Sequence, residues 1–160
     1  MVVRHEWVLL LYRLPREPST PRIALWRNLR RLGVVQLGDG VVALPVDART
    51  TEALEWLADD VLEAGGEASV WRGRPTSPGQ EEAMAARMAS AVAQEYASVG
   101  EAAAAAVLED PVARRRTLGR LRRELHRIAL RDFFPPPERA EARAAVEALA
   151  AAVDEEEVAS

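Results

Sequence analysis

The sequence predicts an α+β fold, and three observations indicate it. The nearly continuous apolar run Trp7–Leu14 is typical of a central strand that is covered on both faces. Residues 38–40 (GDG) separate two short apolar runs and favour a β-hairpin, because glycine permits a positive φ. After residue 79 the apolar residues recur at helical spacing. We therefore expect strands and helices in the first half and helices alone in the second.

The first half of the chain follows the order β-α-β-β-α-β. Thr20 is expected to cap the first helix with Pro21 at its first helical position, and Gly33 is expected to end it. The remaining elements are a strand at 7–14, hairpin strands at 34–37 and 41–44, a helix that begins between residues 47 and 51 and ends at 65, and an edge strand at 67–72. This order predicts a ferredoxin-like plait over residues 1–75, an antiparallel sheet with both helices on one face.

The second half is expected to form a helical extension over residues 76–160, packing on or beside the plait. Two prolines and a glycine in residues 74–79 predict a linker. About three helices follow: one that buries Met84, Met88, Val92, Tyr96 and Val99, one capped by Asp110 that reaches about Arg131, and one from about Glu138 to Val153. The tail after Asp154 is expected to be frayed.

The composition argues against several classes of site. The chain has no cysteine, which excludes disulfides, thiolate catalysis and Cys-ligated metals, and its two histidines are far apart in the sequence. No glycine-rich phosphate loop and no GxSxG motif is present. Metal-dependent nucleases of the CRISPR adaptation machinery share this plait, but they carry an acid where this chain has Tyr12-Arg13-Leu14. We therefore expect no catalysis, no cofactor and no metal.

Arginine distribution gives the strongest candidate site. All 21 basic residues are arginine, and the segment 114–131 holds eight of them against the single acid Glu124. On a helix, one face then carries a row of guanidinium groups, opposite a face of leucine and isoleucine: Arg116, Arg120, Arg123, Arg127 and Arg131. Such a row suits the phosphates of DNA or a small oxyanion. The alternative is a solvated face that is partly paired with the acids of the tail or of a partner subunit.

A second basic group lies on the first helix. It comprises Arg27, Arg30 and Arg31, and Asp59 or Glu63 could neutralise it. The tryptophans at positions 26, 56 and 71 could stack on bases. For Trp26 we expect core packing instead, because it lies within the apolar stripe of its helix.

Several longer phrases of this sequence resemble the N-terminal domain of the ChrB family. They are WVLLLYRLPREPSTPRIALWRNLRRLG, VVQLGDGVVALP and WLADDVLEAGGEASVW within residues 7–75, and EYASVGE and LRRELHRIALRDFFPPPERAEA in the helical half. The resemblance implies a role in chromate response, since the family is regarded as regulating transcription of a chromate efflux operon. Family members often carry a further C-terminal domain that contributes to chromate sensing, and this sequence looks like the N-terminal module standing alone.

These observations predict a non-enzymatic cytoplasmic regulator. The N-terminus lacks the features of a signal peptide, and no apolar run approaches the ~20 residues that a membrane span needs, so no membrane partner is expected. The protein is expected to form a homodimer and to hold DNA phosphates with the arginine row. Two alternatives remain open: a protein-interaction module that uses the open sheet face or the alanine-rich helices, and an oxyanion sensor in which the arginine row binds chromate.

Overall fold

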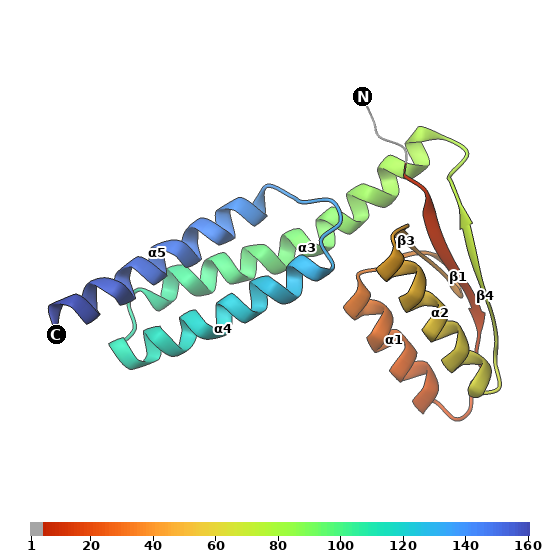
Figure 1. The fold of residues 1–160 in the computed structure, drawn as a ribbon, viewed down its shortest axis with the longest axis horizontal. Helices are drawn as coiled ribbons and strands as arrows, with labels where there is room; N and C mark the ends of the chain where they lie inside the picture. The colour runs from red at the N-terminus through yellow and green to blue at the C-terminus, as the bar shows by residue number, and fades with distance from the viewer. Residues whose placement is uncertain (1–4) are drawn as a thin grey trace. The chain divides into compact units, whose positions relative to one another are not determined.

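The computed structural model describes residues 5–160, which form an α+β fold of two compact units (Figure 1). The first unit reaches to Met88 and the second spans Ala89–Ser160. The elements are β1 (Trp7–Arg13), α1 (Thr20–Leu32), β2 (Val35–Gly38), β3 (Val41–Pro45), α2 (Ala48–Glu63), β4 (Glu67–Gly73), α3 (Pro78–Ala106), α4 (Pro111–Leu130) and α5 (Glu138–Ala159). The predicted class and the predicted order of elements are confirmed.

The sheet of the first unit has four strands in the order β2-β3-β1-β4, and each neighbouring pair is antiparallel. Strand β1 lies between β3 and β4, as its apolar sequence predicts, and β4 forms an edge. Helices α1 and α2 lie on one face of the sheet (Figure 1). Because successive side chains of a strand point to opposite faces, Val8 and Leu10 lie on one face while Leu9 and Leu11 lie on the other.

Helix α1 begins one residue earlier than expected. Thr20 is the first residue of the helix, and Ser19 is the N-cap, although its side chain makes no capping hydrogen bond. The assignment of Thr20 as the cap was therefore wrong. Pro21 is then the second residue of the helix. Proline is accepted there because the N–H groups of the first turn have no partner within the helix. Gly33 ends the helix in the left-handed conformation, with a φ of 79°.

Helix α2 is fixed at its start by a capping box. The Asp47 carboxylate accepts a hydrogen bond from the Thr50 amide at 2.7 Å, and the Thr50 hydroxyl accepts one from the Asp47 amide at 2.9 Å. Leu54, Leu57 and Val61 are buried, as their spacing predicts. The capping box fixes where α2 begins, and the buried side chains pack the helix against β1 and β4.

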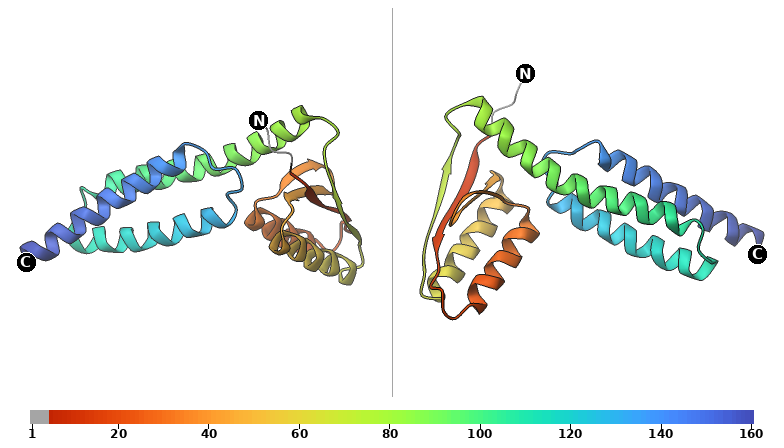
Figure 2. Two further views of the ribbon diagram at one scale, coloured as in Figure 1. Left: turned by 45° about the horizontal axis from the view of Figure 1, so that its top comes forward. Right: turned by 180° about the vertical axis from the view of Figure 1, so that it is seen from behind.

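The second unit is a bundle of three helices, which run side by side in both views of Figure 2. It consists of α3 from Ala89 onward, together with α4 and α5. Its core takes residues from all three helices: Val92, Tyr96, Val99, Ala103 and Ala106 of α3, Leu118, Leu121 and Ile128 of α4, and Ala142, Val146, Leu149 and Val153 of α5. None of the helices within residues 5–160 combines the length and hydropathy that crossing a membrane requires.

The bounds of the helices in the second half differ from the prediction at two places. Helix α3 already begins at Pro78, so the end of the expected linker is helical. Helix α5 continues to Ala159, so the expected fraying after Asp154 was wrong. The reason is a pair of ion pairs from the start of α4: Arg114 binds Glu156, and Arg115 lies 3.8 Å from Glu157. These partners hold the last turns of α5 in place.

Candidate nucleic-acid interface

Helix α4 has one buried face and one cationic face. Leu118, Leu121 and Ile128 enter the core of the second unit. The opposite side carries four exposed arginines, which we call the α4 arginine face: Arg116, Arg120, Arg123 and Arg127. Asp110 caps the helix by accepting hydrogen bonds from the amides of Val112 and Ala113 at 3.1 and 3.0 Å. The Asp110 cap sets where the helix begins, and the buried side chains fix its rotation about its own axis. Together they leave the α4 arginine face exposed to solvent.

Most of the α4 arginine face has no counter-charge among residues 5–160. Across residues 5–160, no hydrogen bond or ion pair joins the side chains of Arg116, Arg120 or Arg123 to another residue. Arg127 differs, because its guanidinium pairs with Glu124 one turn earlier on the same helix. Three guanidinium groups therefore keep their full set of donors for a ligand.

Arg131 does not share this environment. Its guanidinium forms a bidentate ion pair with the carboxylate of Glu95 on α3, with N–O distances of 2.6 and 3.0 Å. It also donates to the main-chain oxygen of Arg127 at 3.0 Å. The side chain is half-buried. The predicted row of five arginines therefore divides into an exposed face and a residue that joins α4 to α3.

The acids of the C-terminal tail neutralise a different part of α4. Arg114 pairs with Glu156 and also donates to the main-chain oxygens of Val107 and Glu109, at 2.8 and 2.9 Å. Arg115 takes Glu157 as its partner. These arginines lie on the side of α4 that meets α5 and the α3–α4 turn. The tail thus leaves the α4 arginine face unpaired.

A buried polar cluster in the second unit was not foreseen. The Tyr96 hydroxyl donates to Asp132 Oδ2 at 2.7 Å, and Arg139 Nη1 lies 3.7 Å from the same oxygen. Burial, followed by the hydrogen bond to Asp132, raises the pKa of Tyr96 to about 12. Asp132 follows α4 in an irregular turn, so no helical or strand spacing in the sequence points to it. The cluster joins α3, the α4–α5 turn and α5.

The second predicted group, Arg27, Arg30 and Arg31, lies exposed on α1 in the first unit. Arg31 Nη1 donates to Asn28 Oδ1 at 3.5 Å, and no ion pair to Asp59 or Glu63 forms within the described part of the chain. This group and the α4 arginine face belong to different compact units. Both groups are exposed, and only the α4 group continues over three helical turns.

One of the three tryptophans that could stack on bases is more exposed than expected. Trp26 is 44% exposed, so its assignment to the core was wrong. The buried stripe of α1 is centred on Leu25 and Leu29, and Trp26 lies at the margin of this stripe. Trp56 and Trp71 are also exposed. Among residues 5–160, no group of three or more histidine, aspartate or glutamate side chains is arranged to hold a metal ion.

Comparison with known proteins points to one family. A family model described as "Protein ChrB, N-terminal" matches residues 22–107, which is more than half of the chain. Protein ChrB of Cupriavidus metallidurans is 37% identical over 65 residues, which cover 41% of this chain and 19% of that protein. The chain thus matches about a fifth of the length of this curated relative. No solved structure matches the chain. The family match covers α1 to α3 and ends before α4.

Proposed function

The chain belongs to the ChrB N-terminal family, and from this premise we propose that it acts in chromate resistance as a DNA-binding regulator of transcription. The proposed DNA-binding surface is the α4 arginine face. A regulator of this kind works in the cytoplasm, where the DNA lies, and needs no catalytic group.

One observation carries the DNA-binding part of the proposal. Arg116, Arg120 and Arg123 are exposed, and nothing within residues 5–160 pairs with them. Successive members are about 5 Å apart along the helix axis, the rise of one turn. A guanidinium group matches a phosphate with two parallel hydrogen bonds, and binding of DNA releases condensed counterions. Three unpaired guanidinium groups in a row therefore favour a backbone of closely spaced phosphates.

The proposed contacts position the protein on DNA and carry little sequence information. Phosphates are the same for every base pair, so arginines that bind only phosphates fix register and orientation. Arg127 is a weaker contributor, because DNA would compete with Glu124 for its guanidinium. Arg131 is left out of the surface, since moving it would leave Glu95 without its partner.

The proposal is tested by neutralising the three unpaired arginines together. In the variant Arg116→Gln, Arg120→Gln, Arg123→Gln we expect the affinity for the DNA upstream of the chain's own reading frame to fall by about a hundredfold or more, because each lost phosphate contact also forgoes counterion release. Fluorescence anisotropy of labelled DNA at fixed salt measures this affinity. The fold should persist, since none of the three side chains is buried or paired.

A matched control is available on α1. The variant Arg27→Gln, Arg30→Gln, Arg31→Gln removes the same charge from another exposed helix. We expect its affinity for DNA to stay within about threefold of the unaltered chain, because the proposed phosphate contacts are all made by α4 and an exposed charge that contacts no phosphate is screened at ordinary salt. Equal losses in both variants would show that net charge alone determines binding. A loss confined to the α1 variant would move the site to α1.

The same unpaired guanidinium groups support a second candidate, a site for a small oxyanion such as chromate. A ligand that binds only the folded state raises the melting temperature, and the rise grows with the logarithm of ligand concentration once that concentration exceeds the dissociation constant. Chromate or sulfate should then stabilise the chain without DNA, and the α4 variant should lose this effect. If DNA binds and neither anion stabilises the chain, the oxyanion site is ruled out and the DNA-binding function is kept.

For the first unit we propose the ferredoxin-like plait. The element order β-α-β-β-α-β, the antiparallel sheet and the placement of both helices on one face support it. An experimental structure of the chain with another strand order, or with α1 and α2 on opposite faces, would contradict it.

A further inference from the structure

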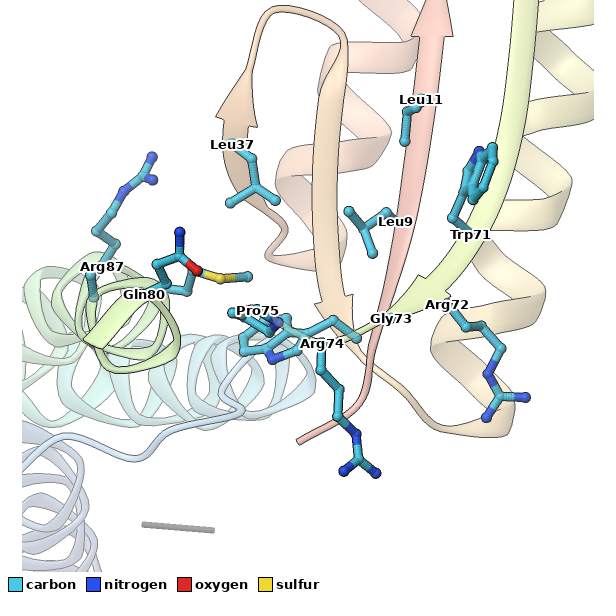
Figure 3. A pocket seen from close by; sticks show the side chains of 13 residues that line it. Leu9, Leu11, Leu37, Trp71, Arg72, Gly73, Arg74, Pro75, Gln80 and Arg87 are labelled. Atoms are coloured by element: carbon cyan, nitrogen blue, oxygen red, sulfur yellow. The ribbon is translucent and has the colours of Figure 1, made fainter. Parts of the chain in front are cut away.

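The face of the sheet opposite α1 and α2 carries an apolar groove, which we call the sheet groove. Its floor is formed by Leu9 and Leu11 of β1, Leu37 of β2 and Trp71 of β4 (Figure 3). Ala83 and Met84 of α3 also line it. All of these residues belong to the first unit. The groove has a volume of about 720 Å³.

The register of the strands explains the groove. Leu9 lies directly opposite Trp71, and Leu11 lies opposite Ser69, so small and large side chains alternate along the floor. The Trp71 indole donates to the Ser69 hydroxyl at 2.8 Å, which fixes the orientation of the ring. Trp71 remains 58% exposed and Leu37 41% exposed. Contiguous apolar side chains left in water mark a binding surface more often than single ones do.

The start of α3 makes one wall of the groove rigid. Glu81 of α3 is buried and accepts hydrogen bonds from the Trp7 indole at 3.0 Å and from the His5 amide at 2.6 Å. These bonds tie the first turns of α3 to β1. Met84, which lines the groove one turn later on α3, is also buried. The groove is therefore largely preformed, as sites for small molecules usually are.

The rim of the groove is cationic. Its lining contains three arginines and neither aspartate nor glutamate. Arg72 points away from the floor, toward Glu6 at 2.7 Å (Figure 3). Arg87 donates one hydrogen bond, to the main-chain oxygen of Gln36 at 2.7 Å, and Arg74 takes part in no hydrogen bond or ion pair within residues 5–160. Arg87 and Arg74 thus have donors available for an anion.

We propose that the sheet groove binds a small amphiphilic anion, an organic acid with an acyl chain or an aromatic ring. The apolar body lies on Leu9, Leu11 and Trp71, and the acid group meets Arg87 or Arg74 at the rim. The volume of the groove falls within the range of small-molecule sites, about 300–1,000 Å³. Charge complementarity selects an acid over a neutral or cationic amphiphile of the same length.

This site differs in chemistry from an oxyanion site. A small hydrated dianion gains nothing from an apolar floor, because it would lose water without gaining hydrogen bonds there. The proposal therefore adds a ligand class to the chain and is independent of DNA binding on α4.

Decanoate serves as the probe, with decanol and decyltrimethylammonium as neutral and cationic counterparts of the same chain length. The readout is the indole N–H signal of Trp71 in ¹H–¹⁵N correlation spectra, assigned with Trp71→Phe. We expect decanoate to shift this signal in a saturable manner, and to leave the signals of Trp26 and Trp56 unchanged, since neither lines the groove. Arg87→Gln should weaken decanoate binding about fivefold, the size of one partly solvated charge contact.

Two matched variants complete the test. Leu37→Glu places an acid in the groove and should abolish the shift, whereas Leu62→Glu on the exposed side of α2 should not affect it. The proposal is overturned if decanol or the ammonium compound binds as tightly as decanoate, or if decanoate leaves the Trp71 signal unmoved. A Trp71 signal that shifts with protein concentration alone would assign the groove to a second copy of the chain and overturn it as well.

Discussion

At the scale of single residues, buried polar side chains in the described part of the chain join separate elements. Glu81 links α3 to β1 in the first unit. Tyr96 and Asp132 link α3 to the α4–α5 turn in the second. Asp132 is nearly inaccessible, and its second oxygen has no partner among the described residues. Such groups are destabilising unless their partners are kept.

The Tyr96 hydroxyl gives a prediction about alkaline pH. Its pKa is raised to about 12 in the folded chain, against about 10 for a solvated phenol. The neutral phenol therefore stabilises the fold below pH ~10, and this contribution is lost as the pH rises from about 10 to 12. We expect the free energy of unfolding to fall across this window, and to fall less steeply in Tyr96→Phe. Urea unfolding followed by circular dichroism at a series of pH values measures it.

The same variant has an effect at neutral pH. Removing the hydroxyl leaves Asp132 Oδ2 without its donor at 2.7 Å. We expect Tyr96→Phe to lower the free energy of unfolding by about 1–3 kcal/mol at pH 7, the penalty for a buried acceptor that has lost its partner. If the two chains have equal stability at pH 7 and lose it in parallel above pH 10, the role given to the Tyr96 hydroxyl is wrong.

At the scale of elements, the β2–β3 hairpin depends on one glycine. Gly40 has a φ of 72°, and its main-chain oxygen accepts a hydrogen bond from the Tyr12 amide at 2.8 Å. A Cβ atom at this position would also clash with the main-chain oxygen of Tyr12. Any other residue at position 40 would therefore have a strained backbone and a crowded side chain.

Gly40→Ala is expected to lower the free energy of unfolding by about 2 kcal/mol or more, from the left-handed backbone and the clash together. Gly38→Ala is the matched control, because its φ is not positive and no atom lies within 4 Å of the added carbon. Thermal unfolding followed by tryptophan fluorescence compares the two. A larger loss in Gly38→Ala than in Gly40→Ala would contradict this assignment of the turn.

The amphipathic pattern of α4 shows what the sequence can predict at this scale. Leu118, Leu121 and Ile128 are buried as their spacing requires. The pattern cannot tell which arginines are free, because the acids that pair with Arg114 and Arg131 come from other helices. Glu95 is 36 residues from Arg131, and Glu156 is 42 residues from Arg114. These pairings depend on how the bundle packs, which local periodicity does not encode.

At the scale of the whole molecule, the order of elements could be predicted because turns and helix ends have strong local signals. Gly33, Asp47 and Asp110 each end or cap a helix as their chemistry predicts. The sheet groove could not be predicted, since it requires β1, β2, β4 and α3 together. The helical tail of α5 was missed for a similar reason, as its partners lie at the start of α4.

The stability of the second unit is expected to depend on the apolar core that its three helices share. Leu149 is fully buried among residues of all three helices, so Leu149→Ala should lower the free energy of unfolding by about 2–5 kcal/mol. Leu108→Ala makes the same chemical change at a residue that is 89% exposed and should have little effect. Far-UV circular dichroism during urea unfolding measures both. Similar losses in the two variants would contradict the core described for this unit.

The central claim, that the α4 arginine face holds DNA phosphates, is tested most directly by the salt dependence of binding. The logarithm of the association constant falls linearly with the logarithm of salt concentration, with a slope of about −0.9 for each phosphate contacted. If Arg116, Arg120 and Arg123 each contact one phosphate, neutralising all three should reduce the magnitude of this slope by about 2.7. An unchanged slope in that variant would contradict the claim.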